Sequence, residues 1–162
     1  MTTWAARPWE ERSLLNPAFV GLLVHGISKG YIDEHGEGLP FLLAFLSVPI
    51  VLHAPTRESL PRSVATSVPA FHTDHPDARV NLGPVAVQFA PSVREAIRYA
   101  ARHRVIDFGP RATLVAGKLG QAPRNFKTDD VVECRERARF VGRWFGRAGD
   151  PVTVLTSWGL KP

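Results

Sequence analysis

One apolar stretch, LPFLLAFLSVPIVL at 39–52, constrains the fold more than any other part of the chain. Its side chains are apolar nearly all round, which is typical of a helix buried at the centre of a protein core. A membrane-spanning helix needs about 20 apolar residues, so this stretch of 14 with two prolines is too short. Pro40 suits the first turn of a helix, and Pro49 should kink or end it. Other helices must therefore pack around this segment.

The length and composition of the chain suit one domain around this core. Of its 162 residues, 44% are hydrophobic, and no low-complexity tract is present. We expect a single domain over 1–162, with 1–12 as an N-terminal extension and 127–162 as a C-terminal helix and tail. No apolar signal sequence follows Met1, and Cys134 is the only cysteine, so secretion and an intrachain disulfide are not expected. These features favour the cytoplasm.

Amphipathic helices are predicted on both sides of the apolar stretch. Apolar residues at helical spacing predict a helix over 13–30, with Asn16 as its N-cap and Gly30 as its end. A polar loop should follow this helix. Beyond the apolar stretch, the apolar residues of 60–71 share one helical face, but Pro69 should bend or break that helix.

The middle of the chain has the order of a helix-turn-helix motif. A short helix is predicted over 84–90 and a second, basic helix over 92–104, with only APS at 90–92 as the turn between them. Ser92 and Glu95 form the S-x-x-E pattern of a capping box, which favours a helix start at this point.

A β-hairpin is predicted directly after the basic helix. Two short apolar runs, at 105–106 and 112–116, flank Gly109-Pro110, which is a common turn sequence. A helix that leads into a hairpin is the last part of a winged helix. We therefore expect the α+β class, as a mainly α-helical, winged helix-turn-helix-like single domain with a small β-hairpin wing.

The C-terminal part contains a long amphipathic helix, predicted over 128–145. Thr128 should cap it, and the two acidic residues at 129–130 lie in its first turn, where the helix dipole favours negative charge. Cys134 lies on its apolar stripe and is expected to be a buried core thiol. For 150–162, a last strand and a helical turn are both open.

Positive charge is concentrated in the second half of the chain. Residues 1–90 contain 6 Lys and Arg against 8 Asp and Glu, whereas residues 91–162 contain 14 against 7. The second half is therefore a candidate for binding nucleic acid or an acidic protein surface, and a solvated basic surface is the alternative.

Five basic residues are the candidate nucleic-acid contacts: Arg94, Arg98, Arg102, Arg111 and Lys118. The first three are spaced by four and stack along one face of the basic helix, while Arg111 lies on the predicted wing. No Asn, Gln, Ser or Thr lies between these three arginines to read base edges. Contact with duplex DNA should therefore be independent of sequence and fall steeply with salt.

The sequence shows no catalytic motif. It has neither the Gly-Lys-Ser/Thr phosphate loop nor a G-x-S-x-G nucleophile elbow. The cluster most similar to metal ligands is His72, Asp74, His75 and Asp77. These four crowd a turn predicted over 72–79, and nothing is spaced to complete a metal shell. We expect no enzyme, cofactor or metal, although a nuclease that uses this cluster is a further hypothesis. The two histidines of the apolar helices, His25 and His53, are expected to be structural.

Four tryptophans are candidate partner contacts: Trp4, Trp9, Trp144 and Trp158. Aromatic side chains are enriched at protein interfaces. The alternative is that they cover the edges of the core.

An ordered set of motifs spans nearly the whole chain, from about Arg7 to Pro162. The motifs are NPAF at 16–19, LAFL at 43–46 followed by Pro49, TRxxLPR at 56–62, ARFVGRWF at 138–145 and GLKP at 159–162. With the predicted wing, this set resembles the middle-component family of bacterial three-component ABC systems.

The resemblance implies a non-catalytic adaptor that couples a Rad50/SMC-like ABC ATPase to an effector, both encoded in the same operon. Such systems look like bacterial defence against phages and plasmids. The resemblance implies no catalytic residues. Duplex DNA and a second copy of this chain are further candidate partners, and a membrane is not expected. A winged-helix protein that contacts duplex DNA through its basic half is the alternative function.

Overall fold

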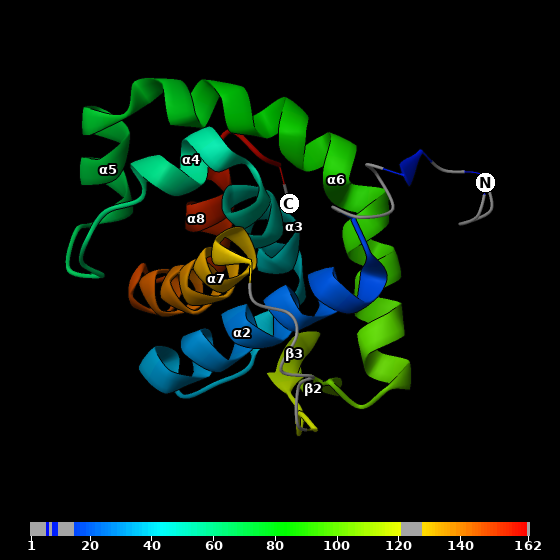
Figure 1. The fold of residues 1–162 in the computed structure, drawn as a ribbon. Helices are drawn as coiled ribbons and strands as arrows, with labels where there is room; N and C mark the ends of the chain where they lie inside the picture. The colour runs from blue at the N-terminus through cyan, green and yellow to red at the C-terminus, as the bar shows by residue number, and fades with distance from the viewer. Residues whose placement is uncertain (1–5, 7, 10–14, 121–127, 162) are drawn as a thin grey trace.

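Helices predominate in the structure, and a small antiparallel sheet lies at one side of them (Figure 1). The computed structural model describes residues 15–120 and 128–161, together with 6, 8 and 9. Most of the expected extension over 1–12 therefore lies outside the described residues. In chain order the elements are α2 (Pro17–His35), β1 (Leu39–Pro40), α3 (Phe41–Leu52), α4 (Ala54–Ser59), α5 (Val68–Asp74), α6 (Pro76–Arg102), β2 (Ile106–Gly109), β3 (Thr113–Ala116), α7 (Asp129–Arg147) and α8 (Pro151–Ser157). The fold is of the expected α+β, mainly helical class.

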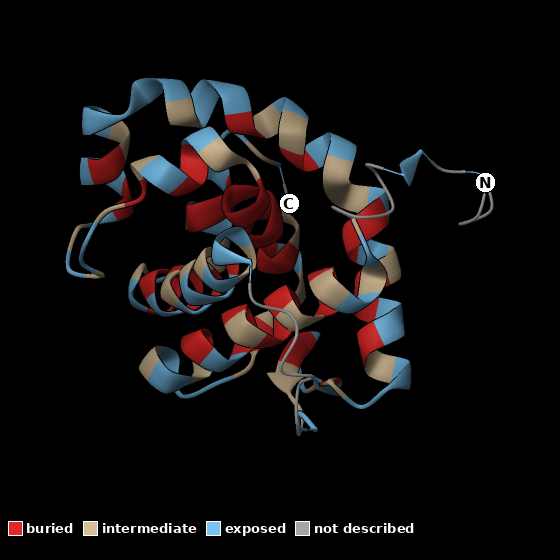
Figure 2. Cartoon of the chain, in the orientation of Figure 1, coloured by how far each residue is buried: buried red, intermediate tan, exposed pale blue. Residues whose placement is uncertain are grey.

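The predicted core helix is α3. It is buried over most of its length, as Figure 2 shows, and it packs against α2, α6, α7 and α8. One detail of the prediction is wrong, since Leu39 and Pro40 form β1. Pro49 does not end the helix, which continues to the predicted end at Leu52. Burial on all sides outweighs the one backbone hydrogen bond that Pro49 removes. Among the residues that the structure describes, no helix combines the length and apolarity needed to cross a membrane.

α2 begins as predicted but is longer. Asn16 is its N-cap, because its Oδ1 accepts a hydrogen bond from the backbone N–H of Ala18 at 2.9 Å. The predicted end at Gly30 is wrong, since the helix continues to His35 and ends at Gly36, whose φ of 83° is left-handed. Gly30 lies inside the helix because its missing side chain allows α7 to approach.

The region after α3 is divided into two short helices. α4 ends at Ser59, residues 60–67 are not helical, and Ser67 caps α5. The single helical face predicted over 60–71 is therefore wrong. Pro69 lies in the first turn of α5 rather than at a break, because its fixed φ suits a first turn and its missing N–H is not needed there.

The predicted helix-turn-helix is wrong, because α6 is one continuous helix. It passes through the expected turn at 90–92, and Ser92 is buried inside it instead of capping a second helix. Pro84 and Pro91 lie two turns apart on its exposed side, and the helix curves around the others (Figure 1). A proline ring bends a helix away from its own side, so both rings suit this outer curve. The inner side is a buried stripe that is completed by the half-buried Phe89 and Ala90. Its buried apolar residues are Leu82, Ala86, Val93, Ala96, Ile97 and Ala100.

The predicted hairpin is confirmed. β2 and β3 pair antiparallel around the tip at 110–112. β1 adds a third strand on the other side of β3, where Leu39 lies opposite Leu114. The hydroxyl of Ser28 donates to the carbonyl oxygen of Leu114 at 2.8 Å, which attaches the sheet to α2. The third strand was not predicted, because two residues are too few to show a period.

The predicted C-terminal helix is confirmed as α7. Its N-cap is Thr128, whose Oγ1 accepts from the backbone N–H of Val131 at 3.4 Å, and Cys134 is buried as expected. Of the two alternatives for 150–162, the structure has the helical one, because Asp150 caps the short helix α8.

Candidate partner interface

α2 and α7 make the largest helix–helix contact of the described chain, and glycines line it. A Cβ on Gly30 would overlap the carbonyl oxygen of Arg139. A Cβ on Gly142 would likewise overlap the carbonyl oxygen of Ile27. The two helices run in the same direction, and their backbones touch because both positions lack side chains.

Ion pairs flank this contact. Arg139 donates to Asp33 at 2.7 Å, and Arg143 binds Glu34 at 2.7 Å. Arg147 lies 3.5 Å from the other carboxylate oxygen of Glu34. Exposed ion pairs of this kind contribute little stability each, but they occupy most of the arginines along this side of α7.

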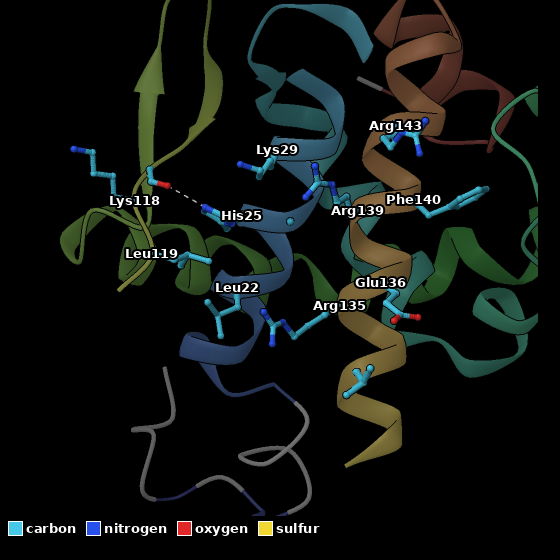
Figure 3. A pocket seen from close by; sticks show the side chains of 13 residues that line it. Leu22, His25, Lys29, Lys118, Leu119, Arg135, Glu136, Arg139, Phe140 and Arg143 are labelled. Atoms are coloured by element: carbon cyan, nitrogen blue, oxygen red, sulfur yellow. Dashed lines mark hydrogen bonds between the residues drawn. The ribbon is translucent and has the colours of Figure 1, made fainter. Parts of the chain in front are cut away.

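One face of this helix pair forms a groove of about 1020 Å³, which the segment 117–119 also borders (Figure 3). We refer to it as the α2–α7 groove. Its apolar lining is Leu22, Leu119, Val132 and Phe140. Its charged lining is Lys29, Lys118, Arg135, Glu136, Arg139 and Arg143. The basic and apolar side chains thus come from three separate parts of the chain.

His25 lies in this groove between α2 and the segment after β3. It is nearly buried, and its Nε2 donates to the carbonyl oxygen of Gly117 at 3.0 Å. Burial lowers the pKa of His25, and the positive charges of Lys29 and Arg135 lower that pKa further. His25 is therefore a neutral, hydrogen-bonded structural histidine, as expected. His53, the other predicted structural histidine, bonds to the hydroxyl of Thr56 at 2.7 Å.

The charge of the groove is not fully balanced by the residues that the structure describes. Lys29, Lys118 and Arg135 are exposed, and none of them forms an ion pair with another residue that the structure describes. Glu136 is the acidic residue of the lining. The described lining of the groove therefore combines an excess of positive charge with apolar side chains.

The structure separates the five predicted nucleic-acid contacts. Arg94, Arg98 and Arg102 are all exposed on α6, and the guanidinium of Arg94 lies 5.8 Å from the ring centre of Phe45. Arg111 forms an ion pair with Glu37 beside the hairpin, whereas Lys118 lines the α2–α7 groove. Arg98 and Arg102 form no ion pair within the described part of the chain.

Two of the four tryptophans predicted as partner contacts lie in the core. Trp144 and Trp158 are each 1% exposed. Both pack against Phe71, and the Trp144 indole N–H donates to the carbonyl oxygen of Thr66 at 2.6 Å. This burial fits the alternative that they belong to the core, and neither side chain is available to a partner in this structure. Trp9 is 66% exposed. Trp4 lies outside the described residues.

The turn predicted over 72–79 is wrong, because His72 and Asp74 belong to α5 and α6 begins at Pro76. His72 packs edge-on against Trp158 at 4.5 Å, and burial lowers the pKa of His72. Within the described residues, no group of three or more His, Cys, Asp or Glu side chains could hold a metal ion.

Arg57 is a buried residue whose role the sequence did not indicate. Its Nη1 donates to the carbonyl oxygen of Val51 at 2.9 Å, and its Nη2 donates to Asp130 at 2.7 Å. Its Nε lies 3.5 Å from Glu133. Arg57 therefore joins α4 to the end of α3 and the start of α7. Its place in the TRxxLPR motif was the one sequence feature that pointed to Arg57. Its burial was not predicted, because arginine side chains are rarely buried.

Comparison with protein families identifies a match over nearly the whole chain. The model of the family described as ABC-three component (ABC-3C) system Middle Component 3 matches residues 4–162. No curated protein and no solved structure matches the chain. The match confirms the resemblance that the motifs indicated.

Proposed function

The chain belongs to the Middle Component 3 family of ABC-three component systems, and from this premise we propose that it is a non-catalytic adaptor. In this proposal it couples an SMC-like ABC ATPase to an effector protein in a cytoplasmic defence complex directed against phages and plasmids. The observation that carries the proposal is the family match over 4–162, because it covers nearly the whole chain.

The chemistry of the reactive side chains supports a non-catalytic role. Cys134 is buried, its Sγ donates to the carbonyl oxygen of Val51 at 3.9 Å, and burial raises its pKa, so the thiolate is disfavoured. His25 is bonded to Gly117, and His72 packs against the indole of Trp158. These groups serve the packing of the fold.

Two chemically different surfaces support an adaptor, which must contact two partners at once. One is the basic α2–α7 groove. The other is the outer side of α6, where Val80 is 72% exposed and Val87 is 69% exposed. Exposed valines two turns apart on one helix are typical of a contact surface for another helix.

Duplex DNA is a second candidate partner. Arg98 and Arg102 favour it, because they are exposed and form no ion pair with any described residue. Because α6 is continuous, the described part of the chain lacks the predicted recognition helix that would read bases in the major groove of DNA. Any DNA contact in this proposal goes to phosphates and is independent of sequence.

Co-expression of the tagged chain with the products of its neighbouring genes tests the adaptor. The complex would be purified at low and high salt, with and without duplex DNA, and its mass measured. We expect a stable assembly that contains an ATPase and an effector. A chain that purifies alone under every condition would contradict the adaptor. The measured mass also gives the copy number of this chain, and so tests whether a second copy is a partner.

The DNA candidate is tested by charge reversal on α6. If Arg98→Glu with Arg102→Glu abolishes DNA binding and leaves the assembly intact, the α6 arginines contact DNA. If DNA binding is unchanged in this variant, the DNA candidate at α6 is wrong.

A further inference from the structure

We propose that the α2–α7 groove binds an acidic segment of a partner protein, with carboxylates meeting its basic side chains and apolar side chains covering its floor. The inference rests on the proposed function, since the partner is the ATPase or the effector of the same complex. Charge, apolar lining, size and rigidity each support it.

The positive charges of the groove come from three separate parts of the chain. Lys29 comes from α2, Lys118 from the segment after β3, and Arg135 from α7 (Figure 3). All three are exposed, and none has an ion-pair partner among the described residues. A segment with two or three carboxylates would therefore find cations on more than one side, whereas the flanking arginines Arg139 and Arg143 are already paired.

The apolar lining favours protein over nucleic acid. Leu119 is 42% exposed and Val132 is 39% exposed, and phosphates gain nothing from such contacts. Phe140 is the aromatic residue of the lining, but its ring is stacked on Trp144 at 6.3 Å and lies 5.8 Å from the guanidinium of Arg137. It is thus not a free platform for a base. Charged groups around an apolar floor are the usual composition of a protein interface.

The size and charge pattern of the groove narrow the occupant. From Val132 to Arg143 the groove follows α7 for about 16 Å, at about 1.5 Å per residue. Three helical turns or about five extended residues fill that length. Glu136 lies among the cations of α7, and it would repel a carboxylate directly opposite. The carboxylates of the segment should therefore meet the unpaired cations of the groove and avoid Glu136.

The groove is held in shape before any partner arrives. The glycine contact at Gly30 and Gly142 fixes α2 against α7. The hydrogen bond from His25 to Gly117 fixes the start of the third wall. A rigid groove loses little conformational freedom on binding, which favours affinity.

Carbodiimide crosslinking of the purified three-component complex tests which groups meet in the groove. This reagent joins a lysine amine to a carboxylate only when they are in contact, and mass spectrometry identifies the pairs. We expect Lys29 and Lys118 to be joined to Asp or Glu residues of one short partner segment. Lys161, which is exposed and outside the groove, is the matched control. Crosslinks that involve Lys161 but neither groove lysine would overturn the proposal.

Charge reversal gives an independent measurement. Lys29→Glu with Arg135→Glu should weaken binding of the partner at least about tenfold, while Arg98→Glu with Arg102→Glu, the same charge change on α6, should not. Val132→Ser should weaken binding a few-fold, whereas Val152→Ser, which changes a valine of similar exposure outside the groove, should not. All these side chains are exposed, and unchanged melting temperatures would confirm that the variants fold.

The outcomes separate the two proposals. If the wild-type chain forms no complex, the adaptor and the groove proposal both fail. If the complex forms and charge reversal in the groove changes its affinity less than twofold, the groove proposal alone fails. If groove reversal abolishes binding of a 20-base-pair duplex or a single strand but spares the protein partners, the groove is a nucleic-acid site and the proposal is overturned.

Discussion

The α2–α7 contact and the outer helix α6 enclose the same core by different means. α2 and α7 meet backbone to backbone at two glycines, so no atom can be added between them. α6 instead covers the core with a stripe of small and apolar side chains and keeps two prolines on its outer side. A contact between backbones fixes a distance, whereas a stripe of side chains can adjust. We therefore expect α7 to tolerate change poorly and α6 to tolerate it well.

The strongest test of this comparison is a single methyl group. Gly142→Ala places a Cβ into the carbonyl oxygen of Ile27, and the backbones must separate. We expect a loss of about 3 kcal/mol in the free energy of unfolding, measured by urea denaturation.

The matched control is Gly83→Ala in α6, where a Cβ would meet nothing within 4 Å. Alanine is the better helix former, so this variant should gain about 0.5–1 kcal/mol. Equal effects of the two substitutions would show that the two regions do not differ as proposed.

The next test concerns Arg57, the buried arginine of α4 that binds the start of α7. Arg57→Ala leaves the carbonyl oxygen of Val51 without its donor and removes the ion pair with Asp130. We expect a loss of about 2 kcal/mol in thermal or urea unfolding. Arg98→Ala on α6 removes an exposed arginine and should stay within about 0.5 kcal/mol. A loss below that level for Arg57 would mean that the buried bonds add nothing to stability.

The ion pairs between the two helices should contribute less. In a double-mutant cycle of Asp33→Ala and Arg139→Ala, we expect a coupling of about 0.5 kcal/mol that decreases with added salt. A coupling that is large and insensitive to salt would show that the exposed pair, and not the glycine contact, holds the helices together.

The last test concerns how the free energy of unfolding depends on pH, and the pKa of His25 should have almost no influence on it at pH 7. Because the pKa of His25 is lowered in the folded protein, the unfolded chain binds a proton first as the pH falls below about 6.5. Stability should therefore be complete above that pH and be lost as the pH falls towards the lowered pKa. His25→Gln can keep a donor for Gly117 without titrating, so unfolding between pH 7.5 and 5 should be less sensitive to pH. An unchanged pH dependence would mean that His25 is not the group involved.

The same two regions show what the sequence could predict. α7 was predicted well because its signals are local: Thr128 as cap, acidic residues in the first turn and an apolar stripe that contains Cys134. α6 was predicted as two helices because APS at 90–92 and the capping-box pattern of Ser92 and Glu95 are local signals for a turn and a new helix. Packing of a continuous inner stripe outweighed those signals, and the sequence alone does not show that packing.

The groove could not be predicted from local sequence patterns. Lys29, Lys118 and Arg135 are far apart in the chain, and only the folded structure brings them together. Composition did indicate a basic second half and an anionic partner, but of the five candidate contacts only Lys118 lies in the groove. The burial of Trp144 and Trp158 also depends on long-range contacts.

The contact between α2 and α7 also has a consequence for the order in which the protein is made. Gly30 and Arg139, which touch, are separated by more than 100 residues of intervening chain. At about 5–20 residues per second, a ribosome needs roughly 5–20 seconds to add 100 residues. During that interval the apolar α3 has no α7 to cover it, so the nascent chain is most exposed to aggregation and proteolysis then. Completion of α7, with α8 directly after it, is thus the step that closes the core.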